Sequence, residues 1–357
     1  MSALNLSRCA ELLSEWYATH YRKLPWRENV DPYRVWISEI MLQQTRIEAV
    51  IPYYHRFMQV CPDVFRLADI SEEQLLKLWE GLGYYSRALN LQKAARVIVD
   101  QYGGVLPADY ELLLTLPGVG EYTAGAIASI AYNIPVPAVD GNVMRVLARL
   151  TGDDTDVLSS GAKKHFGDIV QKMLPLEHAG RFNQALMELG ETVCLPKASP
   201  NCTDCPWKDQ CVARANGAVA SLPIRTKTKP RRIEERIVAV VCVLGEPARV
   251  LLHKRPSEGL LANLWELPNA LISEETRLLP LELRNTCRFI NKLPSAKHIF
   301  SHIEWHMIGR LYQMPHIALP DGYKAVTLAE LQQSFALPGA FRTYAALLPQ
   351  LLQKEDI

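Results

Sequence analysis

The segment from Glu111 to Arg145 reads ELLLTLPGVGEYTAGAIASIAYNIPVPAVDGNVMR, and it decides the fold of the first half of the chain. A short leucine-rich run stops at Pro117-Gly118-Val119-Gly120, and a run rich in alanine and glycine follows from Tyr122 to Tyr132. This order predicts a helix, a tight hairpin and a second helix at about residues 108–132. Both hairpin glycines suit positive φ and leave the backbone uncovered, so we expect its N–H groups to face a phosphate.

An acidic turn follows this hairpin. Asp140-Gly141-Asn142 places one carboxylate close to the hairpin in sequence, which indicates a phosphate clamp beside an acid. A second interpretation stays open, because the hairpin can simply join two helices and Asp140 can be a helix N-cap.

Composition places the chain among globular proteins. Its 357 residues are enough for two domains, and 48% are hydrophobic while 22% are charged. The formal net charge is only +1, so overall charge gives no argument for nucleic-acid binding. No signal-peptide pattern and no apolar run of membrane-spanning length is found. We therefore expect a cytoplasmic protein that has no membrane partner. We also expect a monomer.

The hydrophobic pattern changes along the chain. Residues 1–216 read as helices, and residues 217–234 read as a linker with a cluster of arginine and lysine residues. Residues 235–357 predict an α+β domain with strands at 237–244 and 250–254 and a third strand over Ile299, Ile303, Trp305 and Met307. Helices are expected near 327–335 and 339–353.

Two further segments carry candidate functional residues. Glu39 lies in a helical stretch among Trp36, Ile37, Ile40 and Met41. It is either a solvated helix carboxylate or a buried acid. The glycine-rich loop from Trp79 to Arg87 is either a wedge for a kinked duplex or an ordinary helix connection.

Four of the eight cysteines lie close together in sequence. Cys194, Cys202, Cys205 and Cys211 fall in a short stretch, whereas the other four are scattered in apolar surroundings. In a chain without a secretory signal, this clustering favours a metal or iron–sulfur centre over disulfides. Spacing alone does not separate a four-cysteine zinc site from a [4Fe-4S] cluster.

Taken together, these motifs resemble the helix-hairpin-helix DNA glycosylases that carry a [4Fe-4S] cluster, and within them the MutY family of adenine DNA glycosylases. The resemblance is carried by the motifs at 38–45, 79–85, 116–120, 139–143 and 300–302, with the four cysteines. It implies an all-α helix-hairpin-helix glycosylase domain with the cluster (1–216), a linker (217–234) and a C-terminal α+β Nudix-like domain (235–357). Seven residues separate Cys194 from Cys202, where the family usually has six, and Met144 stands where some relatives have lysine.

The resemblance implies a nucleoid-associated enzyme that hydrolyses the N-glycosidic bond of adenine mispaired with 8-oxoguanine or guanine in double-stranded DNA. Glu39 is expected to protonate adenine at N7, and Asp140 to stabilise or bond to the sugar cation. Tyr122 is expected to orient the sugar, and Asn142 belongs to the same catalytic motif. Bifunctional relatives have lysine in place of Tyr122 and form an imine with it, which a phenol does not.

The resemblance also implies the DNA contacts. Gln44, Leu82 and Tyr84 are expected to fill the gap left by the flipped base, and Gly118 and Gly120 to contact phosphate. Arg27 and Gln184 are expected to contact adenine, with Trp26 as a wall of the pocket. Ser301, held between Phe300 and His302, is the candidate reader of 8-oxoguanine, because its hydroxyl can accept from the N7–H that oxidation creates.

The segment from Gly259 to Arg288 lacks the metal-binding core of active Nudix hydrolases, so phosphohydrolysis is not expected. Two other functions stay open. One is a glycosylase/lyase of the endonuclease III kind, which Tyr122 argues against. The other is a DNA-binding module without activity, which the pair of acids argues against.

Overall fold

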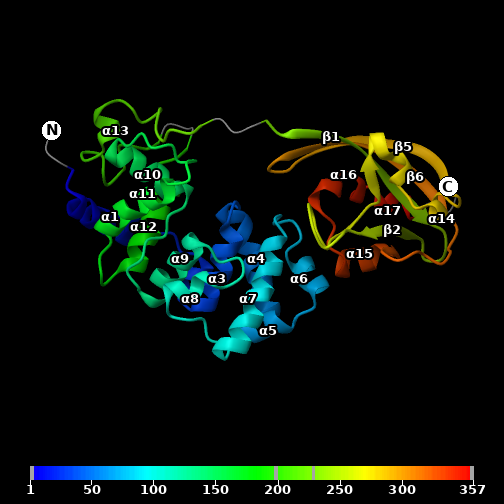
Figure 1. The fold of residues 1–357 in the computed structure, drawn as a ribbon, viewed down its shortest axis with the longest axis horizontal. Helices are drawn as coiled ribbons and strands as arrows, with labels where there is room; N and C mark the ends of the chain where they lie inside the picture. The colour runs from blue at the N-terminus through cyan, green and yellow to red at the C-terminus, as the bar shows by residue number, and fades with distance from the viewer. Residues whose placement is uncertain (1–3, 197–199, 227–229, 354–357) are drawn as a thin grey trace. The chain divides into compact units, whose positions relative to one another are not determined.

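The computed structural model describes residues 4–196, 200–226 and 230–353, so residues 227–229 of the expected linker lie outside the described part (Figure 1). It divides into two compact units. The first comprises residues 1–69 and 90–228, and the second comprises residues 70–89 and 229–357.

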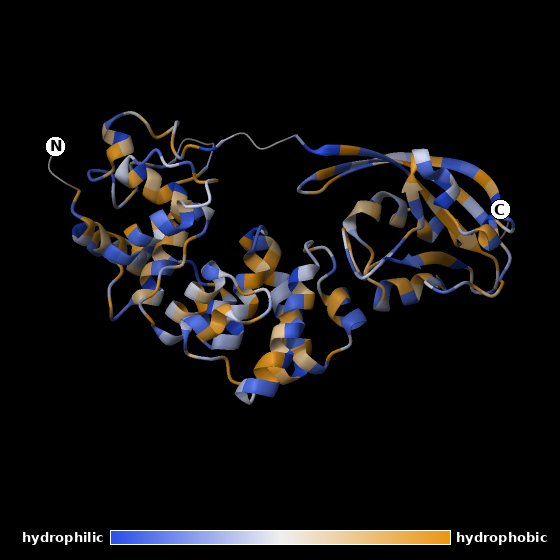
Figure 2. Cartoon of the chain, viewed as in Figure 1, coloured by the Kyte–Doolittle hydropathy of each residue, from blue (hydrophilic) through white to orange (hydrophobic). Residues whose placement is uncertain are grey.

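The first unit is helical, as the sequence predicts. Its helices are α1 (Leu6–His20), α2 (Pro25–Glu28), α3 (Pro32–Leu42), α4 (Ile47–Val60), α5 (Val64–Asp69), α7 (Ser86–Tyr102, which begins in the second unit), α8 (Tyr110–Leu114), α9 (Glu121–Tyr132), α10 (Gly141–Thr151), α11 (Ala162–Met173), α12 (Ala179–Thr192) and α13 (Val212–Ala215). Apolar and polar positions alternate along most of them, as Figure 2 shows by colour. This pattern is typical of helices that bury one face.

Helix α9 lies at the centre of this unit and packs against α3, α8 and α12. Its small residues make the close packing possible. A Cβ atom at Gly125 would lie 2.2 Å from the carbonyl oxygen of Pro137, so only glycine fits there. Helix α12 in turn packs against α10. The arrangement brings the first turns of α9 and α10 close to α3.

The predicted hairpin joins α8 to α9, but its two glycines differ. Gly118 has a φ of +75°, and a Cβ atom there would lie 2.7 Å from Cβ of Asn90. Gly120 has a φ of −100° and a ψ of 178°, which is extended backbone, and it is the N-cap of α9. The prediction of positive φ at Gly120 is therefore wrong, because one left-handed residue already closes the turn.

The second unit is a mixed sheet with short helices. Its elements are α6 (Glu72–Leu78), β1 (Arg232–Val243), β2 (Arg249–Lys254), β3 (Trp265–Glu266), β4 (Asn269–Leu271), η1 (Ile272–Arg277), α14 (Leu281–Arg284), β5 (Arg288–Ile299), β6 (Ile303–Met314), β7 (Tyr323–Val326), α15 (Leu328–Ser334), η2 (Gly339–Phe341), α16 (Arg342–Ala345) and α17 (Leu348–Leu351). The strand order is β3-β2-β1-β6-β5, with β1 parallel to β6 and β5 antiparallel to β6. Strand β4 pairs with β1, and β7 with β2.

Strand β1 is buried on both faces from Ile237 to Val243, which explains its unbroken apolar run. Val238, Val240 and Cys242 face one core cluster, which includes Trp305, Phe341 and Tyr344. The intervening residues of β1 face a second cluster on the other side of the sheet. Such a strand reads as continuously hydrophobic rather than alternating.

Three predicted boundaries in this unit are corrected. The third strand is two strands, because β5 ends at Ile299 and β6 begins at Ile303. Phe300-Ser301-His302 therefore forms the hairpin loop between them, closed by a bond of 2.8 Å from the Phe300 N–H to the Ile303 carbonyl. Strand β1 starts at Arg232, inside the expected linker. The expected helix at 339–353 is three short helical segments. No helix in the described ranges is long and apolar enough to cross a membrane.

Candidate active site

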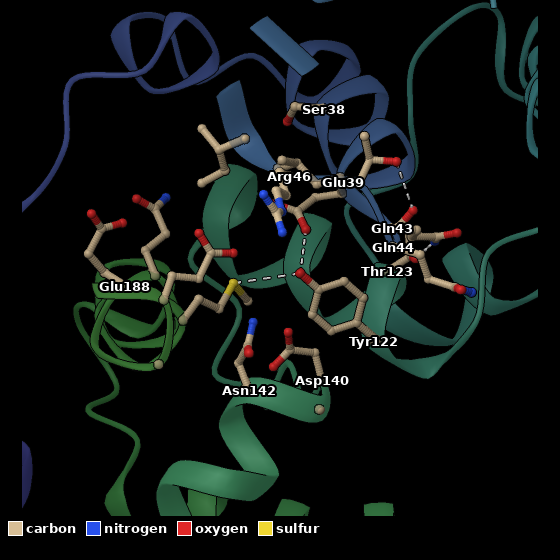
Figure 3. Close-up of a pocket in the computed structure, with 18 of the residues that line it drawn as sticks. Ser38, Glu39, Gln43, Gln44, Arg46, Tyr122, Thr123, Asp140, Asn142 and Glu188 are labelled. Atoms are coloured by element: carbon tan, nitrogen blue, oxygen red, sulfur yellow. Dashed lines mark hydrogen bonds between the residues drawn. The ribbon is translucent and has the colours of Figure 1, made fainter. Parts of the chain in front are cut away.

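A cavity of about 930 Å³ opens in the first unit, between the ends of α2, α3, α9, α10 and α12 (Figure 3). It gathers residues that are far apart in sequence, and all four candidate catalytic residues line it. The candidate residues among its lining are Trp26, Arg27, Glu39, Gln44, Gly120, Tyr122, Asp140, Asn142 and Gln184.

Glu39 enters this cavity from α3 and is buried, with 6% of its surface exposed. The Tyr122 hydroxyl donates a hydrogen bond of 2.6 Å to its Oε2 atom. Burial raises the pKa of Glu39 to about 7, although this bond and the cation of Arg27 act in the opposite direction. Of the two interpretations of Glu39, the buried acid is the correct one. At pH 7 a carboxyl group with this pKa keeps its proton in about half of the molecules.

Tyr122 lies in the first turn of α9. Its hydroxyl lies 3.6 Å from the sulfur of Met187, besides bonding Glu39. Burial, and then the negative charge of Glu39, raise the pKa of this phenol. Tyr122 therefore stays protonated and acts as a hydrogen-bond donor.

Asp140 is both a helix N-cap and a residue of the cavity, so the two interpretations of it are compatible. Its Oδ1 atom accepts a bond of 2.7 Å from the backbone N–H of Val143 at the start of α10. Burial raises its pKa, but the N–H groups of Val143 and Asn142 oppose this effect by favouring the charged form. Backbone donors thus favour the carboxylate form of Asp140, although burial is the larger effect and its pKa stays raised.

One wall of the cavity is formed by α2 and α12 and carries Trp26, Arg27 and Gln184. Trp26 is buried and packs edge-on against Tyr54, at 5.4 Å between ring centroids. Arg27 forms an ion pair of 2.9 Å with Glu188, and the amide oxygen of Gln184 accepts a bond of 2.8 Å from the Tyr17 hydroxyl. This wall therefore consists of the indole ring of Trp26 and two polar side chains that are held by an ion pair and a hydrogen bond.

Gln44 stands in the left-handed region with a φ of +58°. The chain has left α3 just before this point, and Gln44 lines the cavity.

The second unit holds the other candidate DNA contacts except Gly118, which lies in the hairpin of the first unit. Leu82 is buried, whereas Tyr84 is 46% exposed and has a φ of +48°. The hydroxyl groups of Tyr84 and Ser301 lie 2.8 Å apart. Phe300 packs edge-on against Trp305 at 4.9 Å, while His302 is exposed. The unit thus joins the glycine-rich loop to the loop between β5 and β6.

The four clustered cysteines line one small cavity of about 30 Å³. Arg149, Lys208 and Arg214 line it as well, and Nη1 of Arg149 lies 3.3 Å from Sγ of Cys194. In the described ranges, no group of three or more histidine, cysteine or acidic side chains is arranged so that it could hold a metal ion. Four thiols with cations around them are nevertheless a donor set that fits an anionic iron–sulfur cluster.

Sequence reasoning missed a group of charged residues that also line the cavity. Glu188 and Glu191 on α12 and Arg22 before α2 form an ion-pair network there. A signal was present, because Glu188 falls on the apolar stripe of α12 between Leu186 and Leu189, where an unpaired charge is costly. Its partners were not visible, since Arg22 is 166 positions away.

Comparison with known proteins bears on both units. The family of HhH-GPD superfamily base excision DNA repair proteins matches residues 37–172, and the NUDIX domain family matches residues 239–347.

Relatives match over most of the chain. The adenine DNA glycosylase of Mus musculus is 37% identical over 93% of this chain and 77% of its own length. The adenine DNA glycosylase of Buchnera aphidicola subsp. Acyrthosiphon pisum (strain APS) is 34% identical over 87% of each chain. Among solved structures, a thermostable thymine-DNA glycosylase is similar with a TM-score of 0.55 and 27% identity, over 60% of this chain and all of that one.

Proposed function

The chain belongs to the adenine DNA glycosylase family of base excision repair, and from this premise we propose that it hydrolyses the bond between adenine and deoxyribose where adenine is mispaired with 8-oxoguanine or guanine in double-stranded DNA. One observation carries the proposal. A buried carboxyl group whose pKa is raised to about 7 lies in the same cavity as a second carboxyl that is bonded by backbone donors.

The two carboxyl groups have different roles. Glu39 gives its proton to N7 of adenine, so the base leaves as a neutral molecule while the electrons of the C1′–N9 bond go with it. The carboxylate of Asp140 stabilises the positive charge left on the sugar, directly or through a bond to C1′, until water adds there. Asn142 lies beside Asp140 at the start of α10, and both line the cavity.

Tyr122 orients this reaction without taking part in a covalent step. Its phenol holds the carboxyl of Glu39 at 2.6 Å. Forming an imine with the sugar requires an amine, and Tyr122 has none. The protein is therefore proposed to be monofunctional and to leave the DNA strand intact.

The target adenine must leave the base stack to reach this cavity. Trp26 is proposed to flank the flipped base, and Arg27 and Gln184 to contact its edge, because all three line the cavity. Gln44, Tyr84 and Leu82 are proposed to fill and support the gap in the duplex. Gly118 and Gly120 are proposed to bring backbone N–H groups to a phosphate.

The NUDIX-related second unit is proposed to read the opposite base. Ser301 lies in an exposed loop with Phe300 and His302, which favours contact with DNA. Its hydroxyl oxygen is proposed to accept a hydrogen bond from N7–H of 8-oxoguanine, which guanine cannot donate.

Cys194, Cys202, Cys205 and Cys211 are proposed to hold a [4Fe-4S] cluster. Four protein ligands leave no open position, so the cluster would stabilise the fold around α10 and α13 rather than take part in the reaction.

The test is single-turnover release of adenine from a duplex with adenine opposite 8-oxoguanine, run with wild type and Glu39→Gln. We expect release that depends on Glu39, and strand breaks only after treatment with alkali. Strand breaks without alkali would show a lyase, and no release together with binding of the duplex would show a DNA-binding module.

A further inference from the structure

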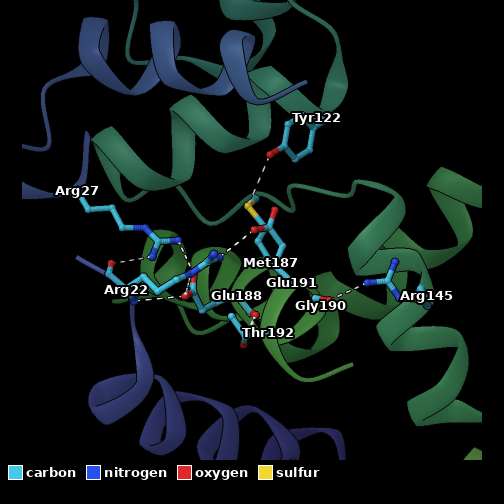
Figure 4. Close-up of polar contacts among 9 residues, drawn as sticks. All are labelled: Arg22, Arg27, Tyr122, Arg145, Met187, Glu188, Gly190, Glu191 and Thr192. Carbon is cyan, nitrogen blue, oxygen red and sulfur yellow. Dashed lines mark hydrogen bonds and ion pairs between the residues drawn. The ribbon is translucent and has the colours of Figure 1, made fainter. Parts of the chain in front are cut away.

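Glu188, on α12, is a buried carboxylate that the reaction itself does not use. Its side chain has 0% exposure, and it pairs with two arginines (Figure 4). Nε of Arg22 donates to Oε1 at 2.5 Å, and Nη2 of Arg27 donates to Oε2 at 2.9 Å. A carboxylate this deep needs such partners, because an unpaired buried charge is strongly destabilising.

Arg27 is held at three points by this arrangement. Besides the bond to Glu188, its Nη1 donates to the carbonyl oxygen of Arg22 at 3.1 Å, and its guanidinium lies 5.9 Å from the ring centroid of Tyr17. Its side chain is 14% exposed and lines the same cavity as Glu39. The planar fork of arginine suits two bonds in fixed directions, which a lysine ammonium does not provide.

We infer that Glu188 is a positioning residue for base excision, which fixes the guanidinium of Arg27 in the orientation that receives the flipped adenine. This inference rests on the proposed function, since Arg27 is the residue proposed to contact the base. Glu188 touches neither the base nor the sugar, and it acts through Arg27. Orientation of this kind matters because a displacement of about 1 Å near a reacting base costs roughly 100-fold in rate.

The test uses the full-length protein and a duplex with adenine opposite 8-oxoguanine. Glu188→Gln removes the charge and keeps the shape. We expect single-turnover release to slow by roughly 10- to 100-fold. Glu266→Gln is the matched control, because Glu266 is another buried carboxylate that pairs with an arginine, Arg255, at 2.9 Å in the second unit. Its single-turnover rate is expected to stay within about twofold of wild type.

A double-mutant cycle separates positioning from general support of the fold. In an Arg27→Gln background, Glu188→Gln is expected to cost less than about twofold, because the residue through which it acts is gone. If the rate losses of Arg27→Gln and Glu188→Gln multiply in the double variant, the inference is overturned. A wild-type rate in Glu188→Gln overturns it as well.

Arg27→Lys keeps the cavity charge and leaves Glu188 in place, so it tests the same geometry if Glu188→Gln does not fold. The single-turnover rate of Arg27→Lys is expected to fall by about 10- to 90-fold. A wild-type rate in this variant overturns the inference. A wild-type protein that releases no adenine overturns the proposed function and this inference together, whereas an active wild type with Glu188→Gln at the wild-type rate overturns the inference alone.

Discussion

The phenol of Tyr122 and the carboxyl group of Glu39 are joined by a hydrogen bond of 2.6 Å, across 83 positions of sequence. The two side chains come from α9 and α3, which pack against each other at the centre of the first unit. Both are buried, and burial raises the pKa of each. This contact keeps a protonated acid fixed in direction, which is the state that protonation of a leaving base requires.

The first prediction concerns the pH dependence of base release. The pKa of Glu39 is raised to about 7, and its acid form is the one proposed to react. The single-turnover rate should therefore be level below pH 7 and fall by about tenfold per pH unit well above it. Glu39→Gln should lower the rate by roughly 100- to 10,000-fold at pH 7 and abolish this limb. If Glu39→Gln keeps some activity and its rate still falls above pH 7 as in wild type, the titrating group is not Glu39.

The second prediction concerns stability. Because the pKa of Glu39 is higher in the folded protein than its ordinary value of 4.5, the folded state binds more protons between pH 4.5 and 7. Stability from this group is full below pH 4.5 and falls as pH rises to about 7. Glu39→Gln should therefore be more stable than wild type at pH 8, by about 1–3 kcal/mol in denaturant unfolding.

Glu111→Gln is the control for this measurement, because Glu111 is an exposed glutamate. Its effect should stay within about 0.5 kcal/mol. Equal stability of wild type and Glu39→Gln at pH 8 would mean that burial does not destabilise the ionised form.

The third prediction separates the two roles of Asp140. Asn at this position still accepts the bond from the Val143 N–H but has no charge, so Asp140→Asn should abolish most base release and change stability by less than about 0.5 kcal/mol. Asp140→Ala removes the cap as well and should cost about 1 kcal/mol more. The measurements are single-turnover release and thermal unfolding. If Asp140→Asn keeps its activity, a group other than the Asp140 carboxylate stabilises the sugar cation.

Local sequence patterns predicted the features that depend on neighbouring residues. The hairpin between α8 and α9 was visible in Pro117-Gly118-Val119-Gly120, and the burial of Glu39 was one of two open interpretations of its apolar neighbours. The unbroken apolar run at 237–244 correctly indicated a strand, since both faces of β1 are covered.

Features that depend on distant residues could not be predicted in this way. The bond between Tyr122 and Glu39 and the pairing of Arg22 with Glu188 exist only after packing. The predicted third strand ran across Ile299 and Ile303, although a hairpin loop separates these two residues. A period-2 pattern of apolar residues does not show where a chain reverses direction. Gly120 looked like a left-handed residue from its type alone, although Gly118 already provides that conformation.

The fourth prediction concerns the four cysteines. If they hold a [4Fe-4S] cluster, the purified protein should be yellow-brown, with broad absorbance near roughly 400 nm and about four iron atoms per chain. Cys205→Ser should lower the iron content, whereas Cys287→Ser should not, because Cys287 is a separate thiol in the second unit. A colourless protein with one zinc ion per chain would contradict this assignment.

The fifth prediction concerns recognition of the opposite base through Tyr84 and Ser301, whose hydroxyl groups lie 2.8 Å apart. If the Ser301 hydroxyl donates its hydrogen bond to the Tyr84 oxygen, its own oxygen is left to accept a hydrogen bond from N7–H of 8-oxoguanine. Ser301→Ala should therefore lower the preference for 8-oxoguanine over guanine by about 10-fold, with release of adenine opposite guanine unchanged.

Tyr84→Phe keeps the ring but removes the acceptor for the Ser301 hydroxyl, so the preference should fall less, by about two- to fivefold. Ser334→Ala, which changes an exposed serine of α15, should leave the preference as in wild type. The measurement is the ratio of single-turnover rates on the two duplexes. A wild-type ratio in Ser301→Ala would exclude its hydroxyl as the reader, and a fall in Tyr84→Phe alone would indicate that the Tyr84 hydroxyl, rather than that of Ser301, senses the lesion.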